Sequence, residues 1–171
     1  MNSRFRRLVM LSAIGLLAAC GKGGDNPATP VEIAKDTACT LDGMLLADYP
    51  GPKAQVHYSG LAQPDWFCDT LEMFNVYLNP EQARLVTGMF VQDMGKTDWD
   101  KPVANWIDAK TAIYVFGSKR LGSMGPTAAS FSSEADAQAF AAQHGGKVLK
   151  FDEVKPDMVI LDGGALHDQS M

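Results

Sequence analysis

The sequence predicts an α+β fold made of two tandem β-β-α-β units. The order strand, strand, helix, strand can be traced over residues 37–95 and again over residues 111–154. In each half, one segment with helical periodicity lies between segments whose hydrophobicity alternates as in strands. A chain of 171 residues also has the length of one ordinary domain or two small ones.

Residues 1–19 are predicted to be a signal peptide. Three arginines in the first seven residues form a basic region, and the apolar run that follows is too short to span a bilayer. The run ends in "LAAC", which resembles the lipobox of bacterial lipoproteins, so we expect lipidation of Cys20 after cleavage. The alternative is an ordinary signal peptide followed by a chance cysteine. Gly21 rather than aspartate after Cys20 indicates a lipoprotein of the outer membrane that faces the periplasm.

The mature chain is predicted to be acidic. Cleavage would remove three arginines and no acidic residue, which moves the formal net charge from −5 to −8. An acidic chain without a basic run is a poor partner for nucleic acid, and we expect none. Residues 20–36 are rich in glycine and proline and are expected to be a flexible tether between the lipid and a soluble body.

In the first unit, "KAQVHYSG" alternates as a strand does, and "PDWFCD" leads into the helical pattern "TLEMFNVYL". "ARLVTGMFVQDM" reads as the next strand, and residues 96–110 are expected to connect the units. The helix is predicted to have an apolar face made of Leu71, Phe74, Val76, Tyr77 and Leu78.

In the second unit, "TAIYVFGS" and "TAASFSS" are predicted strands, and "KVLKFDEV" closes the unit as a third. The helix between them should begin after Ser133, which opens a Ser-x-x-Asp capping pattern, and end at Gly145. Residues 155–171 show little pattern and are expected to form a partly disordered tail. Trp66, Trp99 and Trp106 are expected to pack in the core or between the halves.

Two cysteines, Cys39 and Cys68, remain once Cys20 carries lipid. In an oxidising periplasm such a pair often forms a disulfide, and a metal site is the competing interpretation. The chain contains no G-x-S-x-G, no H-E-x-x-H and no phosphate-binding glycine loop. A nucleophilic pair of either cysteine with His57 has no support from spacing. We therefore expect no enzyme.

The chain has nine methionines, and Met44, Met94 and Met124 each lie next to a glycine. Thioethers and thiolates are soft ligands that select Cu(I), and a methionine on a glycine-containing loop can point outward. The alternative is that Met94 and Met124 fill gaps beneath loops. His57 lies in an alternating strand, where it faces either solvent or the edge of the core.

Several stretches together resemble the NosL family of nitrous oxide reductase accessory proteins. In order along the chain they are "CTLDGM", "DYPGPKAQ", "FCDTLEM", "VQDMG", "WIDA", "YVFGS", "GSMG" and "AFAAQHGGKVLKFDEV". The resemblance implies a small periplasmic lipoprotein that binds Cu(I) and supplies copper for the copper centres of nitrous oxide reductase, directly or through a membrane transporter assembly. It also implies a pair of β-β-α-β units like that of the organomercurial lyase MerB.

The resemblance includes one departure. Many family members carry C-x-x-C-G-M, and this chain has Asp42 in place of the second cysteine, which the family uses for copper. A carboxylate is a harder ligand than a thiolate and should hold Cu(I) more weakly. The resemblance therefore implies Cys39 and Met44 as the central ligands, completed by Asp42 or His57, with Met124 as a further candidate.

Three alternatives stay open. A disulfide between Cys39 and Cys68 would make copper loading depend on reduction. A lyase like MerB would use Cys39, Asp42 and Cys68 to cleave carbon–mercury bonds. A lipoprotein scaffold of the maturation machinery would bind no metal of its own.

Overall fold

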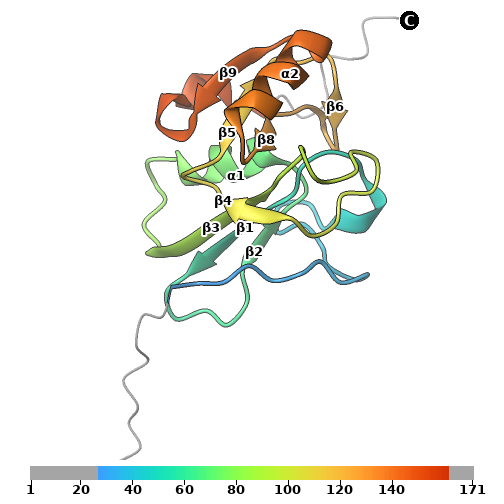
Figure 1. The fold of residues 1–171 in the computed structure, drawn as a ribbon. Helices are drawn as coiled ribbons and strands as arrows, with labels where there is room; N and C mark the ends of the chain where they lie inside the picture. The colour runs from blue at the N-terminus through green and yellow to red at the C-terminus, as the bar shows by residue number, and fades with distance from the viewer. Residues whose placement is uncertain (1–26, 162–171) are drawn as a thin grey trace, which may run out of the picture.

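The computed structural model describes residues 27–161, and it confirms the predicted α+β fold and the order of its elements (Figure 1). The predicted signal peptide and Cys20 lie outside the described residues. The first unit contains β1 (Ala54–Tyr58), β2 (Asp65–Phe67), α1 (Thr70–Tyr77) and β3 (Val86–Gln92). The second contains β5 (Ile113–Phe116), β8 (Ala129–Phe131), α2 (Glu134–His144) and β9 (Lys147–Lys150). Among residues 27–161, no helix combines the length and apolar character needed to cross a membrane.

The two units share one sheet topology. The first sheet has the order β2-β1-β3-β4, where β4 is Trp106–Asp108, and the second has β8-β5-β9, with antiparallel pairing throughout. In each unit, the first strand therefore lies between the second and the last. Three 3-10 helices also occur in the described residues, at Leu46–Asp48, Phe151–Glu153 and Pro156–Met158.

Three short strands lie outside the predicted pattern. β4 (Trp106–Asp108) belongs to the expected connector but pairs with β3, with Val91 opposite Ile107. β6 (Leu121–Gly122) and β7 (Gly125–Pro126) form a small hairpin between β5 and β8. Strands of two or three residues are too short to show an alternating pattern, so only their pairing partners reveal them.

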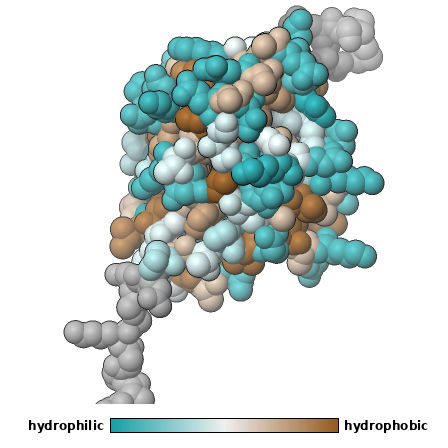
Figure 2. Space-filling view, viewed as in Figure 1, coloured by the Kyte–Doolittle hydropathy of each residue, from teal (hydrophilic) through white to brown (hydrophobic). Residues whose placement is uncertain are grey.

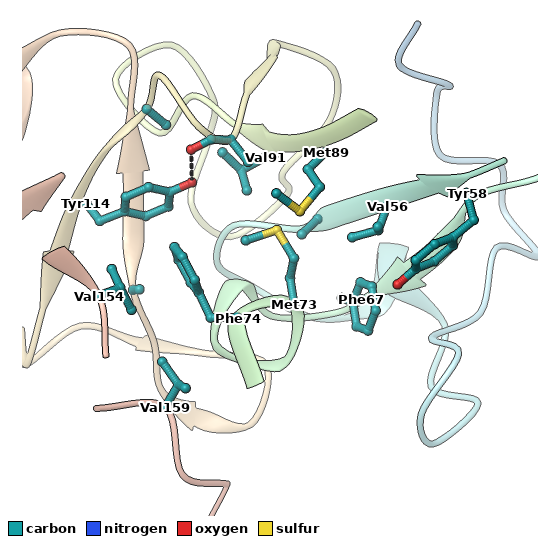
Figure 3. Packing of buried hydrophobic residues seen from close by; sticks show 14 residues of the cluster. Val56, Tyr58, Phe67, Met73, Phe74, Met89, Val91, Tyr114, Val154 and Val159 are labelled. Atoms are coloured by element: carbon teal, nitrogen blue, oxygen red, sulfur yellow. Dashed lines mark hydrogen bonds between the residues drawn. The ribbon is translucent and has the colours of Figure 1, made fainter. Parts of the chain in front are cut away.

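A single core joins the units. Figure 3 shows Met73 of α1 beside Met89 of β3, and Phe74 beside Tyr114 of the second unit. The ring centroids of Phe74 and Tyr114 lie 4.9 Å apart. Phe74 is fully buried, and the other residues of the predicted apolar face are half-buried and pack against this core. The predicted apolar face is thus confirmed, and Met73, which was not part of it, is fully buried as well.

A second hydrophobic cluster lies under α2. There Trp99 stacks on Phe140 with ring centroids 5.4 Å apart, beside Phe131. Trp66 and Trp106 are half-buried and pack on each other, at 5.9 Å, along the first sheet. Trp99 is therefore a core residue, as predicted.

The helix ends follow the sequence signals. Ser133 caps α2, with its hydroxyl accepting from the backbone N–H of Asp136. Gly145 ends the helix with φ +76° and donates to the Ala141 carbonyl. The space-filling view shows hydrophilic residues interspersed with more hydrophobic ones over the part of the molecule that contains α2 (Figure 2).

Both ends of the described chain are attached to the body. Val31 exchanges two backbone hydrogen bonds with the Gln55 side chain, so this part of the expected tether follows the first sheet. Val159 is buried in the main core, and its carbonyl accepts from the Asn75 amide. Residues 155–161 of the expected partly disordered tail are therefore ordered against the core; residues 162–171 lie outside the described range.

Candidate metal site

The stretch "CTLDGM" folds into a tight turn. The Cys39 N–H donates to the Met44 carbonyl over 2.8 Å, and the Gly43 N–H donates to the Cys39 carbonyl over 3.0 Å. The Asp42 side chain accepts from the Met44 N–H over 2.9 Å, as aspartate often does in turns. Gly43 has φ +77°, a conformation that other residues adopt with strain. The local sequence therefore determines the shape of this turn.

The turn is held against β2. The Thr40 N–H donates to the Trp66 carbonyl over 2.8 Å, and the Trp66 N–H donates back to the Thr40 hydroxyl over 2.9 Å. Cys68 follows β2 directly. The two-way contact therefore brings Cys68 next to Cys39, 29 positions away in the sequence.

Four side chains meet at this point. One ligand atom each from Cys39, Asp42, Cys68 and Glu72 lies within 4.8 Å of all the others. Both cysteines are free thiols and are buried, and Glu72 is buried with them, while Asp42 is exposed. Of the two fates predicted for the cysteines, the structure thus shows the unpaired one.

Glu72 connects the two thiols. Its Oε2 atom accepts from Cys39 Sγ and from Cys68 Sγ, each over 3.4 Å, and from the Cys68 backbone N–H over 3.1 Å. Sequence reasoning missed this residue. The spacing could have indicated it. Cys68 and Glu72 are four residues apart at the start of a helix, and side chains four residues apart lie on the same face of a helix.

The thiols differ in acidity. The hydrogen bond from Cys68 lowers the pKa of the Cys39 thiol, and the same contact, together with burial, raises the pKa of Cys68. Burial also raises the pKa of Glu72, against the hydrogen bonds from both thiols. The Cys39 thiol is therefore the more readily ionised of the two.

A buried cation borders the cluster. Lys53 is fully buried, and its Nζ atom donates to the Pro50 carbonyl (2.8 Å), the Cys68 carbonyl (3.1 Å) and the Ser123 hydroxyl (2.7 Å). Burial lowers the pKa of Lys53 to about 8, and the charges of Asp69 and of the cluster oppose this shift. A positive charge beside the thiols favours their ionised form.

The three methionines that were predicted as candidate ligands have different surroundings in the structure. Met44 is half-buried and packs against the small hydrophobic cluster of Cys39, Leu46 and Cys68, so this side chain lies beside the site. Met124 is exposed in the turn of the β6–β7 hairpin, next to Ser123, whose hydroxyl contacts the Cys68 carbonyl. The glycine turn of the second unit thus lies near the first unit, and Met124 stays a predicted ligand. Met94 packs into the second cluster, in agreement with a gap-filling role.

His57 lies elsewhere. Its Nε2 atom is 2.9 Å from Gln55 Oε1, and its ring meets the edge of Phe90. Burial lowers the pKa of this imidazole. The group of four converging side chains does not include His57, whose role as a ligand stays a prediction.

A cluster of two thiols and two carboxylates, with a methionine packed beside it, offers soft sulfur donors to a thiophilic ion. Residues 30–159 match the model of the NosL family. The chain belongs to the NosL family. The described units and the converging cysteines all lie within the matched range.

Curated NosL proteins are similar along nearly their whole length. The copper-binding lipoprotein NosL of Stutzerimonas stutzeri is 37% identical, over 95% of this chain and 88% of that protein. Its namesake from Achromobacter cycloclastes is 35% identical, over 94% of this chain and 85% of that protein. The crystal structure of the copper chaperone NosL from Shewanella denitrificans has a TM-score of 0.72 at 36% identity, covering 77% of this chain and 98% of that one.

Proposed function

We propose that this NosL-family chain is a periplasmic lipoprotein that binds Cu(I) and passes it on for the copper centres of nitrous oxide reductase. The observation that carries the proposal is the meeting of two unpaired, buried thiols, with the Met44 side chain packed against the cluster that contains them. Soft sulfur donors favour Cu(I) over harder ions. The similar proteins that are named for copper binding support the same cargo.

The position of the site fits transfer rather than storage. Cys39 is only 4% exposed, yet it belongs to a surface turn. The next residue, Thr40, is exposed, and Leu41 is 48% exposed. A partner's thiol or thioether that contacts this turn would meet the ion without unfolding of the core. We infer that copper enters and leaves at the 39–44 turn.

The proposal includes an anchor and a partner. Cys20 carries lipid, palmitate included, and holds the chain at the outer membrane, facing the periplasm. The receiving partner is nitrous oxide reductase or its membrane transporter assembly, and the role in denitrification is not enzymatic. An acidic body favours docking on a basic surface. Cys20→Ala should move the protein from the membrane fraction to the periplasmic fraction; unchanged fractionation would refute the anchor.

Binding is tested by competition with a chromogenic Cu(I) chelator, on residues 21–171, reduced and without oxygen. We expect one tightly bound Cu(I) per chain. Oxidation to the Cys39–Cys68 disulfide before loading should lower the affinity, and re-reduction should restore it. Absence of stoichiometric binding by the reduced protein would favour the metal-free scaffold. Transfer is tested by mixing the loaded protein with apo nitrous oxide reductase and measuring copper in each after separation.

One observation favours a second candidate, an organomercurial lyase. Cys39, Asp42 and Cys68, the residues that such a lyase would use, do converge. In that reaction a proton would replace mercury on carbon, and the thiolates would hold the released Hg(II). Incubation with an organomercurial and measurement of the released hydrocarbon decides between the two. We expect no turnover, and sustained turnover would revive the lyase.

A further inference from the structure

We propose that Cu(I) is held between the sulfur atoms of Cys39 and Cys68, on two separate segments, and that Glu72 positions both thiols. This inference deepens the proposed function and rests on it. It makes Cys68 the second thiolate ligand, a residue that the ligand set implied by the family resemblance did not include.

The two sulfurs lie close enough together for one ion to bridge them. A zinc–thiolate bond is about 2.3 Å long, so an ion of similar size can bridge two sulfurs that lie up to about 4.6 Å apart. The ligand atoms of Cys39 and Cys68 lie within 4.8 Å of each other. The ion can therefore bind without a large movement of either backbone segment.

Both segments are held in place before metal binds. The turn that carries Cys39 is joined to β2 by the two hydrogen bonds between Thr40 and Trp66. The segment that carries Cys68 is fixed from the other side, since its carbonyl accepts from the buried Lys53 ammonium. A preformed site spares the ion the cost of ordering its ligands.

Glu72 acts through the thiols. Its Oε2 atom contacts both sulfurs and the Cys68 N–H, so one carboxylate sets the side-chain direction of both cysteines. Carboxylates are hard ligands that bind Cu(I) poorly, which makes a positioning role more apt than direct ligation. Residues of this kind contribute about 10–100-fold to metal affinity.

Position 42 gives a rescue experiment. The Asp42 carboxylate reaches the same point as the two sulfurs, so a cysteine at position 42 would place a thiolate there. Asp42→Cys should therefore restore a dithiolate site with Cys39 in a chain that lacks Cys68. A purely structural role of Cys68 in packing would not be replaced by a thiol at position 42.

The experiment compares wild type, Cys39→Ser, Cys68→Ser, Glu72→Gln and Cys68→Ser/Asp42→Cys as reduced residues 21–171. Cu(I) affinity is measured by chelator competition, and the number of sulfur ligands by X-ray absorption. Met94→Leu is the matched control, because it removes a sulfur that packs in the second cluster. Circular dichroism checks that each variant is folded.

We expect each cysteine variant to lose at least about a hundredfold in affinity and one sulfur from the copper shell. Glu72→Gln should lose about 10–100-fold while the sulfur count stays unchanged. The double variant should regain most of the affinity, and Met94→Leu should match wild type.

Tight binding by wild type that persists in Cys68→Ser would overturn the ligand assignment and leave the proposed function intact. A single thiolate sulfur in the wild-type copper shell would do the same, even if Cys68→Ser failed to fold. Absence of Cu(I) binding by wild type would instead overturn the proposed function itself.

Discussion

Phe74→Ala tests whether the two units share one core. Phe74 is fully buried in α1 of the first unit, and its ring meets three rings of the second. The centroid distances are 4.9 Å to Tyr114, 5.3 Å to Phe151 and 6.0 Å to Phe116. Removing this ring should therefore weaken both units together.

The magnitude follows from the burial. Transfer of a buried phenylalanine side chain from water contributes about 1.5–3 kcal/mol. Its aromatic pairing adds about 0.5–1.5 kcal/mol, and the cavity left behind adds more. We expect a loss of about 3–5 kcal/mol in the free energy of unfolding, from a total of about 5–15 kcal/mol in ordinary domains.

The assay is equilibrium unfolding of residues 21–171 in urea, followed by tryptophan fluorescence and by far-ultraviolet circular dichroism. Both probes should give one transition that shifts to lower urea. Leu78→Ala is the control on the same helix; because Leu78 is only half-buried, it should cost less. A loss below about 1 kcal/mol for Phe74→Ala, or two transitions of which one stays in place, would refute the shared core.

Three further changes test separate features. Burial raises the pKa of Asp69 from 3.8 to about 7. The folded state keeps the Asp69 proton to a higher pH than the unfolded chain does. The contribution of this proton to the free energy of unfolding is therefore fully present below about pH 4 and is lost as the pH rises to about 7. Asp69→Asn should make the urea midpoint depend less on pH over that range. A pH dependence of the midpoint equal to that of wild type would contradict the reasoning. Gly122→Ala would place a Cβ atom against Asp69 Oδ2 and 2.8 Å from the Thr127 Cβ, so overpacking should cost about 1–3 kcal/mol, measured by calorimetry. A neutral result would mean that the hairpin can shift. Ser133→Ala removes the cap of α2 and should cost about 1 kcal/mol in urea unfolding, whereas Ser133→Asp should cost little. Equal losses in both would argue against capping.

Much of the fold could be predicted because its signals are local. Ser133 and Gly145 mark the ends of α2 through groups within four residues. The alternation in β1 directs Val56 into the core without knowledge of its neighbours. β4 and the position of Val159 could not be predicted in this way, because each depends on a partner far along the chain.

The same distinction between local and long-range interactions applies to the metal site. The sequence by itself determined the turn from Cys39 to Met44, since Asp42 and Gly43 set its shape, and it determined the soft donors that the chain offers. Only the tertiary structure decided which donors meet. It brought Cys68 to Cys39, left both as free thiols, and added Glu72, whose carboxylate contacts a sulfur 33 residues away. The physical reason is range: a turn forms from neighbouring backbone groups, whereas a cluster of side chains depends on how distant segments pack.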